Sequence, residues 1–171
     1  MSVPTVSVSR VTTLPTDSEA AQFWALIETA WDRAGSAART ALLTPGADLP
    51  REHTDRFIDA LRSLSTDFTS AELTALDRVA ERALYEIDRA DIQEITDGSD
   101  DGFLYARGFI VAMGREHYEA VLADPAVAVP DAECEEMCYF FAHLHDRLYG
   151  GFPETGSGIS RETASNPAGW S

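Results

Sequence analysis

The sequence contains no lysine, and all 13 of its basic residues are arginine. Aspartate and glutamate number 29, so the formal net charge is -16. Nucleic-acid binding draws most of its affinity from basic side chains that neutralise phosphate, so this shortage argues against a DNA or RNA partner. It argues equally against anionic membrane surfaces. A basic protein is the partner class that the charge favours, and the sequence assigns no oligomeric state.

Long apolar runs are also missing. The stretch FIVAM at residues 109–113 is far shorter than the roughly 20 residues that span a bilayer. The first residues show no charged start followed by an apolar block, so we expect no secretory signal. Only two cysteines are present, Cys134 and Cys138, and their spacing on one predicted helix disfavours a disulfide. We therefore expect a cytoplasmic protein with reduced thiols.

Motifs of common enzyme classes are absent as well. The chain has no nucleophile elbow of the form G-x-S-x-G, no phosphate-binding loop, no dinucleotide glycine fingerprint and no zinc-protease helix motif. The sequence therefore assigns no catalytic residue, and we expect no cofactor.

Helical patterns fill the chain from residue 16 to residue 150. Thr16 with Glu19 and Thr69 with Glu72 form two capping boxes, and the second opens a long apolar stripe that ends near Gly98. Further helices are expected from about residue 50, over residues 103–122 with a break at Gly114, and over residues 131–149. The composition, with 44% hydrophobic and 25% charged residues, is that of a globular protein.

These patterns predict an all-α fold, with a single compact domain of five to six helices at residues 16–150. Residues 1–15 are expected to form an irregular arm, in which the alternation TVSVSRVTT also fits one short edge strand. Residues 151–171 lack any period and are predicted to be a tail, either flexible or docked on the domain.

The stretch GSDDGF at residues 98–103 has two interpretations. Ser99 stands where a helix N-cap belongs, and Asp100 and Asp101 then fall in the first turn, where negative charge is stabilised. The alternative is a polar pocket at this helix start, formed by Asp100, Asp101, Tyr105 and Arg107. A metal role for the two aspartates is not expected, because adjacent side chains on a helix diverge.

Two other groups of residues contain side chains that occur in binding sites. Cys134, Cys138 and His145 share one helix face, but Phe141 and Leu148 lie on the same face, which indicates core rather than a zinc site. No metal site is therefore predicted. Trp24, seven residues before Trp31 on the first helix, is a candidate for a ligand or partner surface if its ring is exposed.

Two segments of the chain resemble a known family. FWALIETA at residues 23–30 and SDDGFLYARGFIVAMGREHYEAVLADP at residues 99–125 are similar to the bacterial domain-of-unknown-function family 4240. The resemblance runs over about residues 20–149. It implies an α-helical domain and carries over no activity.

Two functional hypotheses follow. The first is a non-catalytic acidic protein-interaction module, an accessory or immunity-like factor for a basic protein. The second is a small enzyme or small-ligand binder that uses a polar pocket at the Ser99–Phe103 helix start.

Overall fold

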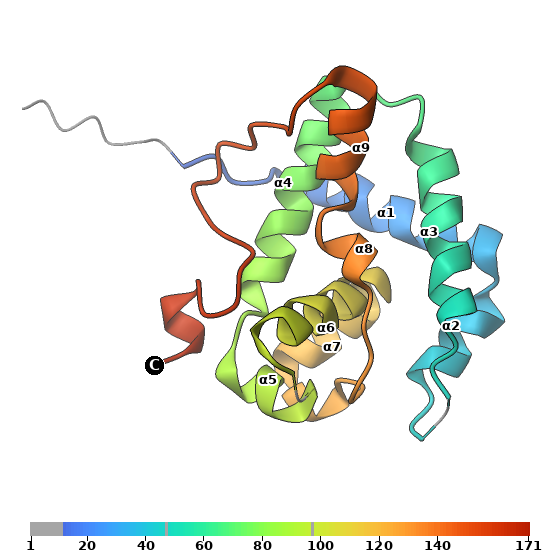
Figure 1. Ribbon diagram of the computed structural model, residues 1–171, viewed down its shortest axis with the longest axis vertical. Coiled ribbons are helices and arrows are strands. Elements are labelled where there is room, and N and C mark those ends of the chain that lie inside the picture. The colour runs from blue at the N-terminus through green and yellow to red at the C-terminus, as the bar shows by residue number, and fades with distance from the viewer. Residues whose placement is uncertain (1–11, 47, 97) are drawn as a thin grey trace, which may run out of the picture.

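The computed structural model describes residues 12–46, 48–96 and 98–171, and in these ranges the chain is helical without a β-strand. The predicted edge strand falls largely on residues 1–11, outside the described ranges. Figure 1 shows the elements. The α-helices are α1 (Asp17–Ala34), α2 (Ser36–Leu43), α3 (Arg51–Ser65), α4 (Ser70–Glu86), α5 (Ala90–Thr96), α6 (Asp100–Ala112), α7 (Arg115–Ala123), α8 (Glu135–Cys138) and α9 (Phe140–Tyr149). Two short 3-10 helices are η1 (Pro125–Val127) and η2 (Pro167–Gly169).

The described residues thus form nine α-helices, and the prediction of five to six was wrong. Gly114 separates α6 from α7 with φ of 100°, a backbone conformation that L side chains rarely adopt, and this break agrees with the prediction. The difference in number arises elsewhere. The long helix expected from Thr69 to about Gly98 ends at Glu86, and α5 begins separately at Ala90. Tyr139 separates α8 from α9 with φ of -131°, which is outside the helical region. The short α2 lies in a segment that the sequence patterns did not assign to a helix.

The helix starts that rest on capping boxes were confirmed. Thr16 accepts a hydrogen bond from the backbone N–H of Glu19, whose side chain accepts one from Thr16 in return. Thr69 and Glu72 make the same reciprocal pair at the start of α4. Each box satisfies backbone donors that would otherwise lack a partner inside the helix.

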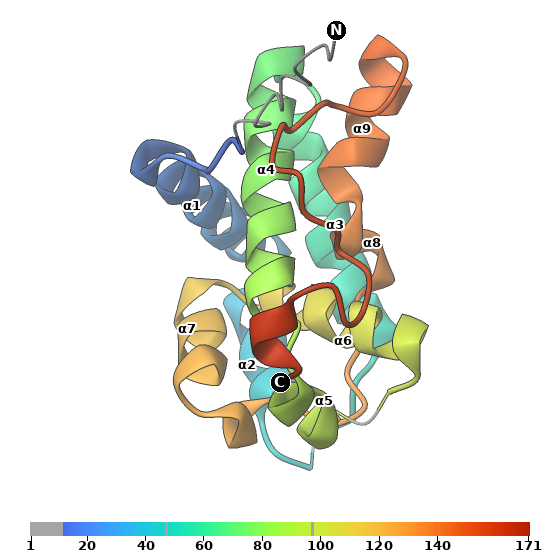
Figure 2. The same cartoon turned by 90° about the vertical axis from the view of Figure 1, so that its left-hand side faces the viewer.

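Helix α4 is the axis of the domain. Figure 2 shows it upright at the centre, with α1 and α7 to one side and α8 and α9 to the other. Helix α1 packs on α3 and α4, α9 packs on α4, and α8 packs on α6. Helices α5, α6 and α7 gather at the lower end of α4 in this view.

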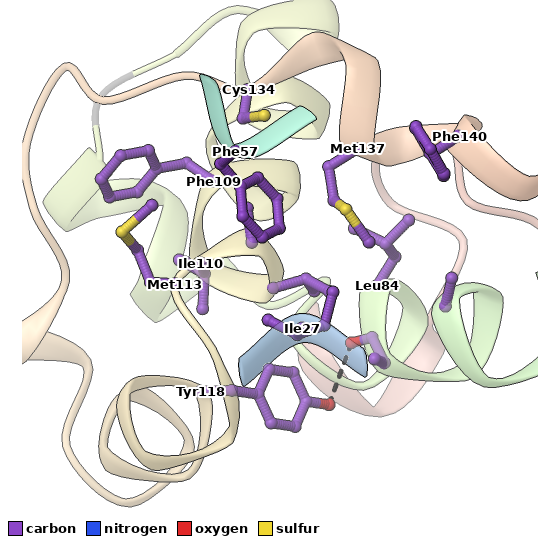
Figure 3. Packing of buried hydrophobic residues seen from close by; sticks show 14 of the residues in the cluster. Ile27, Phe57, Leu84, Phe109, Ile110, Met113, Tyr118, Cys134, Met137 and Phe140 are labelled. Atoms are coloured by element: carbon purple, nitrogen blue, oxygen red, sulfur yellow. Dashed lines mark hydrogen bonds between the residues drawn. The ribbon is translucent and has the colours of Figure 1, made fainter. Parts of the chain in front are cut away.

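The core lies between these helices. Figure 3 shows Ile27 of α1, Phe57 of α3, Leu84 of α4, Phe109 of α6 and Met137 of α8 converging. All five side chains are buried. Each contributes about 1.5–3 kcal/mol through the removal of apolar surface from water.

Residues 151–171 form a tail that packs along α4. Figure 2 shows the tail descending beside α4 toward α5. Arg78 of α4 donates from Nε to the carbonyl oxygen of Thr155 at 2.7 Å. At the lower end, the buried Asp88 accepts hydrogen bonds from the tail, including one from Trp170 Nε1 at 3.0 Å. The tail is therefore fixed to the middle of α4 and just beyond its C-terminal end, and it can contribute side chains to a site on this face.

Candidate functional site

Ser99 caps α6, which confirms the structural interpretation of GSDDGF. Its hydroxyl accepts a hydrogen bond from the backbone N–H of Gly102 at 3.2 Å. Asp100 and Asp101 occupy the first turn, where the positive end of the helix dipole stabilises negative charge. The side chain of Asp100 is exposed, and its carbonyl oxygen accepts a hydrogen bond from the Thr163 hydroxyl of the tail at 2.6 Å.

Asp101 and Tyr105, four residues apart on α6, border a pocket of about 330 Å³ that we call the acidic pocket. Its other walls come from α8, α9 and the tail. Four of its nine lining residues are carboxylates, and none is an arginine. The lining residues are Asp101, Leu104, Tyr105, Glu135, Glu136, Cys138, Tyr139, His143 and Glu162.

The acidic pocket owes its shape to the close packing of α6 and α8. A Cβ atom on Gly108 would lie 2.4 Å from the carbonyl oxygen of Cys134 and 2.7 Å from Sγ of Cys138, so only glycine fits there. The Cys134 backbone N–H donates to the carbonyl oxygen of Tyr105 at 3.0 Å. The Cys138 thiol donates to the carbonyl oxygen of Leu104 at 3.3 Å. These contacts fix α6 against α8 at the floor of the pocket.

Arg107 does not line the acidic pocket, although the sequence placed it in the candidate site. Its side chain is fully buried. Nη1 donates to the carbonyl oxygen of Leu84 at 2.9 Å, and Nη2 donates to that of Arg161 at 2.9 Å. Burial lowers the pKa of Arg107, but a guanidinium remains charged in proteins. Arg107 thus attaches the tail to α4 and α6 and is not available to a ligand.

Trp24 lies in another part of the molecule. Its ring is largely buried and packs on those of Phe23 and Tyr118, with centroid distances of 4.9 and 5.1 Å. It borders a separate cavity between α1, α4 and α7. The structure therefore brings together Asp101 and Tyr105, leaves Asp100 exposed beside them, and separates Arg107 and Trp24 from the pocket.

A second pocket of about 350 Å³ adjoins the acidic pocket, because Tyr139 and His143 line both. We call it the tail pocket, and its lining residues are Asp77, Glu81, Tyr139, Ala142, His143, Phe152, Pro153 and Arg161. Phe152 is 63% exposed, and its ring centroid lies 5.8 Å from that of His143. An exposed aromatic side chain at the rim of a pocket can serve as an anchor for a partner.

A buried ion pair forms the floor of the tail pocket. Arg161 of the tail donates to Oδ2 of Asp77 at 2.6 Å, and it lies 3.3 Å from Oε2 of Glu81. Oδ1 of Asp77 has no hydrogen-bond partner among the described residues. Burial raises the pKa of Asp77, and the charge of Arg161 opposes this shift without cancelling it. Removal of Arg161 would leave the buried carboxylate of Asp77 without a counter-charge.

A third pocket, of about 200 Å³, lies on the other side of His143. It is bordered by Arg62, Glu136, Phe140, His143, Leu144 and Arg147. Because His143 borders all three pockets, they lie next to one another, and we call the three together the α8–α9 groove. The groove is acidic on the α6 side and carries two arginines on the α3 side.

Two tyrosine hydroxyls and one thiol of the groove are held in their protonated forms. The negative charge of Glu135 raises the pKa of Tyr105. Burial, together with a hydrogen bond to Glu162, raises the pKa of Tyr139 to about 12. Burial also raises the pKa of the Cys138 thiol to about 12. Near neutral pH these three groups keep their protons and can donate hydrogen bonds. None of them is an activated nucleophile or a base.

Among the described residues, no three His, Cys, Asp or Glu side chains converge as metal ligands would. Cys134 and Cys138 are both buried and not disulfide-bonded, as expected for core positions. The two ring nitrogens of His145 lie 2.6 Å from the Ser70 hydroxyl and 2.8 Å from the Gly151 carbonyl oxygen. Leu148, expected in the core, is exposed at the surface.

Sequence reasoning missed the groove residues contributed by α4, α9 and the tail. One signal was present for Asp77, which lies four residues after Leu73 and seven before Leu84 and so shares the apolar face of α4. A charged residue on that face requires a buried partner. No pattern identified the partner as Arg161, which follows 84 residues later in an aperiodic segment.

None of the helices in the described ranges is both long and apolar enough to cross a membrane. No curated protein and no solved structure matches this chain. A family described as "Protein of unknown function (DUF4240)" matches residues 19–147. The match extends from α1 to the last turns of α9 and leaves out the tail residues Phe152, Arg161 and Glu162. This confirms the resemblance seen in the sequence, and the chain belongs to the DUF4240 family.

Proposed function

We propose that the protein is a non-catalytic interaction module, an accessory or immunity-like factor that binds a basic segment of a partner protein in the α8–α9 groove. The observation that carries this proposal is the acidic pocket, which has four carboxylates and two tyrosines but no arginine in its lining. The proposal also places the protein in the cytoplasm, because that compartment keeps thiols such as those of the two cysteines reduced.

The acidic pocket suits the side chain of an arginine or lysine. Carboxylates on opposite walls, such as Asp101 and Glu135, can accept charge-assisted hydrogen bonds from a guanidinium. The rings of Tyr105 and Tyr139 can contact the same cation through their faces. Phe152, exposed beside the tail pocket, offers an apolar anchor for the next part of the partner.

The net charge of the chain supports the same kind of partner. At -16, the protein attracts basic surfaces over long distances and accelerates their association at low salt. The protonation of Tyr105, Tyr139 and Cys138 supports a binding role rather than a catalytic one, because none of them is poised as a nucleophile or base.

The second candidate function is a small-ligand binder or small enzyme at the α6 start. It is favoured by the placement of Asp101 and Tyr105 on one pocket wall. A thermal-shift screen of small uncharged polar compounds tests it. Stabilisation of the wild type that is lost in Asp101→Asn/Tyr105→Phe would favour this function over the interaction module.

The main proposal is tested by affinity capture from a lysate of the source organism, with the tagged full chain as bait. The groove variant is Glu135→Gln/Glu136→Gln/Glu162→Gln, which removes three charges and leaves an acceptor for Tyr139. The control variant is Glu52→Gln/Glu94→Gln/Glu116→Gln. It removes the same charge from exposed positions outside the groove, two of them in first turns of helices.

We expect one basic protein to be recovered with the wild type and the control, and to be depleted at least about tenfold with the groove variant. Thermal unfolding of all three baits verifies that they are folded. Equal recovery with the groove variant, or no basic protein with the wild type, would refute the proposal.

A further inference from the structure

An open pocket of about 460 Å³ lies away from the groove, between α1, α4 and α7. We call it the Trp24 cavity. Its walls are mainly apolar, with Leu14, Trp24, Val79 and Ala83 among them. This size and lining are typical of small-molecule sites, in which a few polar groups fix the orientation of an apolar ligand.

Arg82 of α4 is the first polar group of the Trp24 cavity. None of the ion pairs among the described residues includes it. Its Nε atom is buried and has no hydrogen-bond partner there, and its guanidinium stacks over the ring of Tyr85 at 5.5 Å. This half-buried guanidinium forms no ion pair among the described residues, although the carboxylates of Asp17 and Glu86 line the same pocket, so it can pair with the carboxylate of a ligand.

Glu86 is the second polar group, one helical turn after Arg82. Its Oε2 accepts a hydrogen bond from the Tyr118 hydroxyl at 3.1 Å, and that hydroxyl also lies 3.0 Å from the carbonyl oxygen of Ala83. Figure 3 shows this second contact at the edge of the core. Burial raises the pKa of Tyr118, so the hydroxyl remains a donor that holds Glu86 in place. The remaining oxygen of Glu86 can accept from a cation.

We propose that the Trp24 cavity binds a free α-amino acid with an apolar side chain, its carboxylate on Arg82, its ammonium on Glu86 and its side chain against Trp24. An α-amino acid carries both charges on one carbon, which suits two oppositely charged side chains that neighbour each other at i and i+4. Such a zwitterion has no net charge, so the negative potential of the protein does not repel it.

This site is independent of the α8–α9 groove. Val79, Arg82 and Glu86 face the cavity, whereas Asp77 and Glu81 of the same helix border the tail pocket. Figure 2 places α1 and α7 on the opposite side of α4 from α8 and α9. Failure of either proposal leaves the other unaffected.

The test is an NMR titration of the isotope-labelled full chain with L-phenylalanine and L-leucine. The comparison ligands are 2-phenylethylamine, which lacks the carboxylate, and 3-phenylpropionate, which lacks the ammonium. We expect the amino acids to shift resonances of residues that line the cavity. Each comparison ligand should bind at least about tenfold more weakly, because one charge-assisted contact is lost.

Two variants localise the effect. Arg82→Gln and Glu86→Gln should each weaken binding of L-phenylalanine about tenfold, whereas Arg56→Gln, an exposed arginine on α3, should leave it unchanged. If Arg82→Gln fails to fold, the comparison of ligands on the wild type remains decisive. Equal binding of either comparison ligand, shifts confined to other regions, or no shift with both amino acids would overturn the proposal.

Discussion

Replacement of Asp88 by asparagine should release the lower end of the tail from α4. Asp88 follows the last turn of α4 and is almost completely buried. Its Oδ1 accepts from the backbone N–H of Ala164 and from Nε1 of Trp170, both at 3.0 Å. Its Oδ2 accepts from the backbone N–H groups of Ser165 and Asn166 at 2.7 and 3.0 Å. One carboxylate therefore satisfies four donors.

The size of the effect follows from this geometry. Asparagine keeps one acceptor oxygen, which can still serve two of the four donors. The other two donors would face its NH₂ group, which cannot accept a hydrogen bond from them. Two hydrogen bonds to a charged group are lost, and each contributes about 1.5–3 kcal/mol. Docking of residues 164–170 should therefore weaken by about 3–6 kcal/mol. Because 1.4 kcal/mol corresponds to a factor of ten, local opening should increase by a factor of about 10² to 10⁴.

Amide hydrogen exchange measures this opening directly. Exchange at Ala164, Ser165 and Asn166 should accelerate by that factor in Asp88→Asn, while the core of α1 remains protected. Asp91→Asn serves as the control, because Asp91 pairs with Arg89 at the surface of α5, where an ion pair contributes at most about 1 kcal/mol. Exchange in Asp88→Asn within about fivefold of the wild type would refute the reasoning.

Three further predictions concern stability. Ser99→Ala removes the cap of α6 and should cost about 1 kcal/mol in urea unfolding, and a loss near zero would mean that the cap is dispensable. Gly108→Ala forces a Cβ against the carbonyl oxygen of Cys134 and should cost at least about 1–3 kcal/mol, whereas an unchanged unfolding midpoint would contradict the close packing of α6 and α8. Burial lowers the pKa of His117 to about 4, so below its usual pKa near 6.5 the unfolded state binds a proton that the native state does not. Protonation of His117 should therefore lower the free energy of unfolding by up to about 3 kcal/mol between pH 6.5 and pH 4. In His117→Gln, the free energy of unfolding should fall less between pH 7 and pH 4 than it does in the wild type.

The helical part of the fold was readable because its signals are local. A capping box needs only two residues three apart, and both predicted boxes are present at Thr16 and Thr69. Apolar periodicity likewise placed Trp31 and Cys138 in the core. The number of helices was not readable, because breaks such as that at Tyr139 depend on tertiary packing rather than on turn residues.

The candidate site was only partly readable because the tail completes it. Asp101 and Tyr105 lie in or just after the GSDDGF motif, which is recognisable from neighbouring residues alone. Arg161 and Glu162 reach the groove through individual hydrogen bonds between the tail and the helices, and such contacts leave no periodic pattern. Arg107 was assigned to the site because it follows the aspartates on α6, but its role is to hold the tail.

The family match covers only part of the residues that line the groove. Asp101, Tyr105, Tyr139 and most other groove residues lie within residues 19–147. Phe152 and the tail residues 161 and 162 lie outside that range. The matched part therefore supplies most of the acidic pocket, and the tail completes the groove with Phe152, Arg161 and Glu162.

The most direct measurement of the central claim is an NMR titration of the labelled full chain with N-acetyl-arginine amide, compared with N-acetyl-citrulline amide, its uncharged counterpart. The account predicts that the arginine derivative shifts the resonances of Asp101, Tyr105, Glu135 and Tyr139 with a Kd of about 1 mM, a free energy of about 4 kcal/mol. The citrulline derivative and the groove variant should show at least about tenfold weaker effects. Equal resonance shifts with both derivatives would contradict recognition of a basic partner in the groove. So would shifts that are confined to residues outside the acidic pocket.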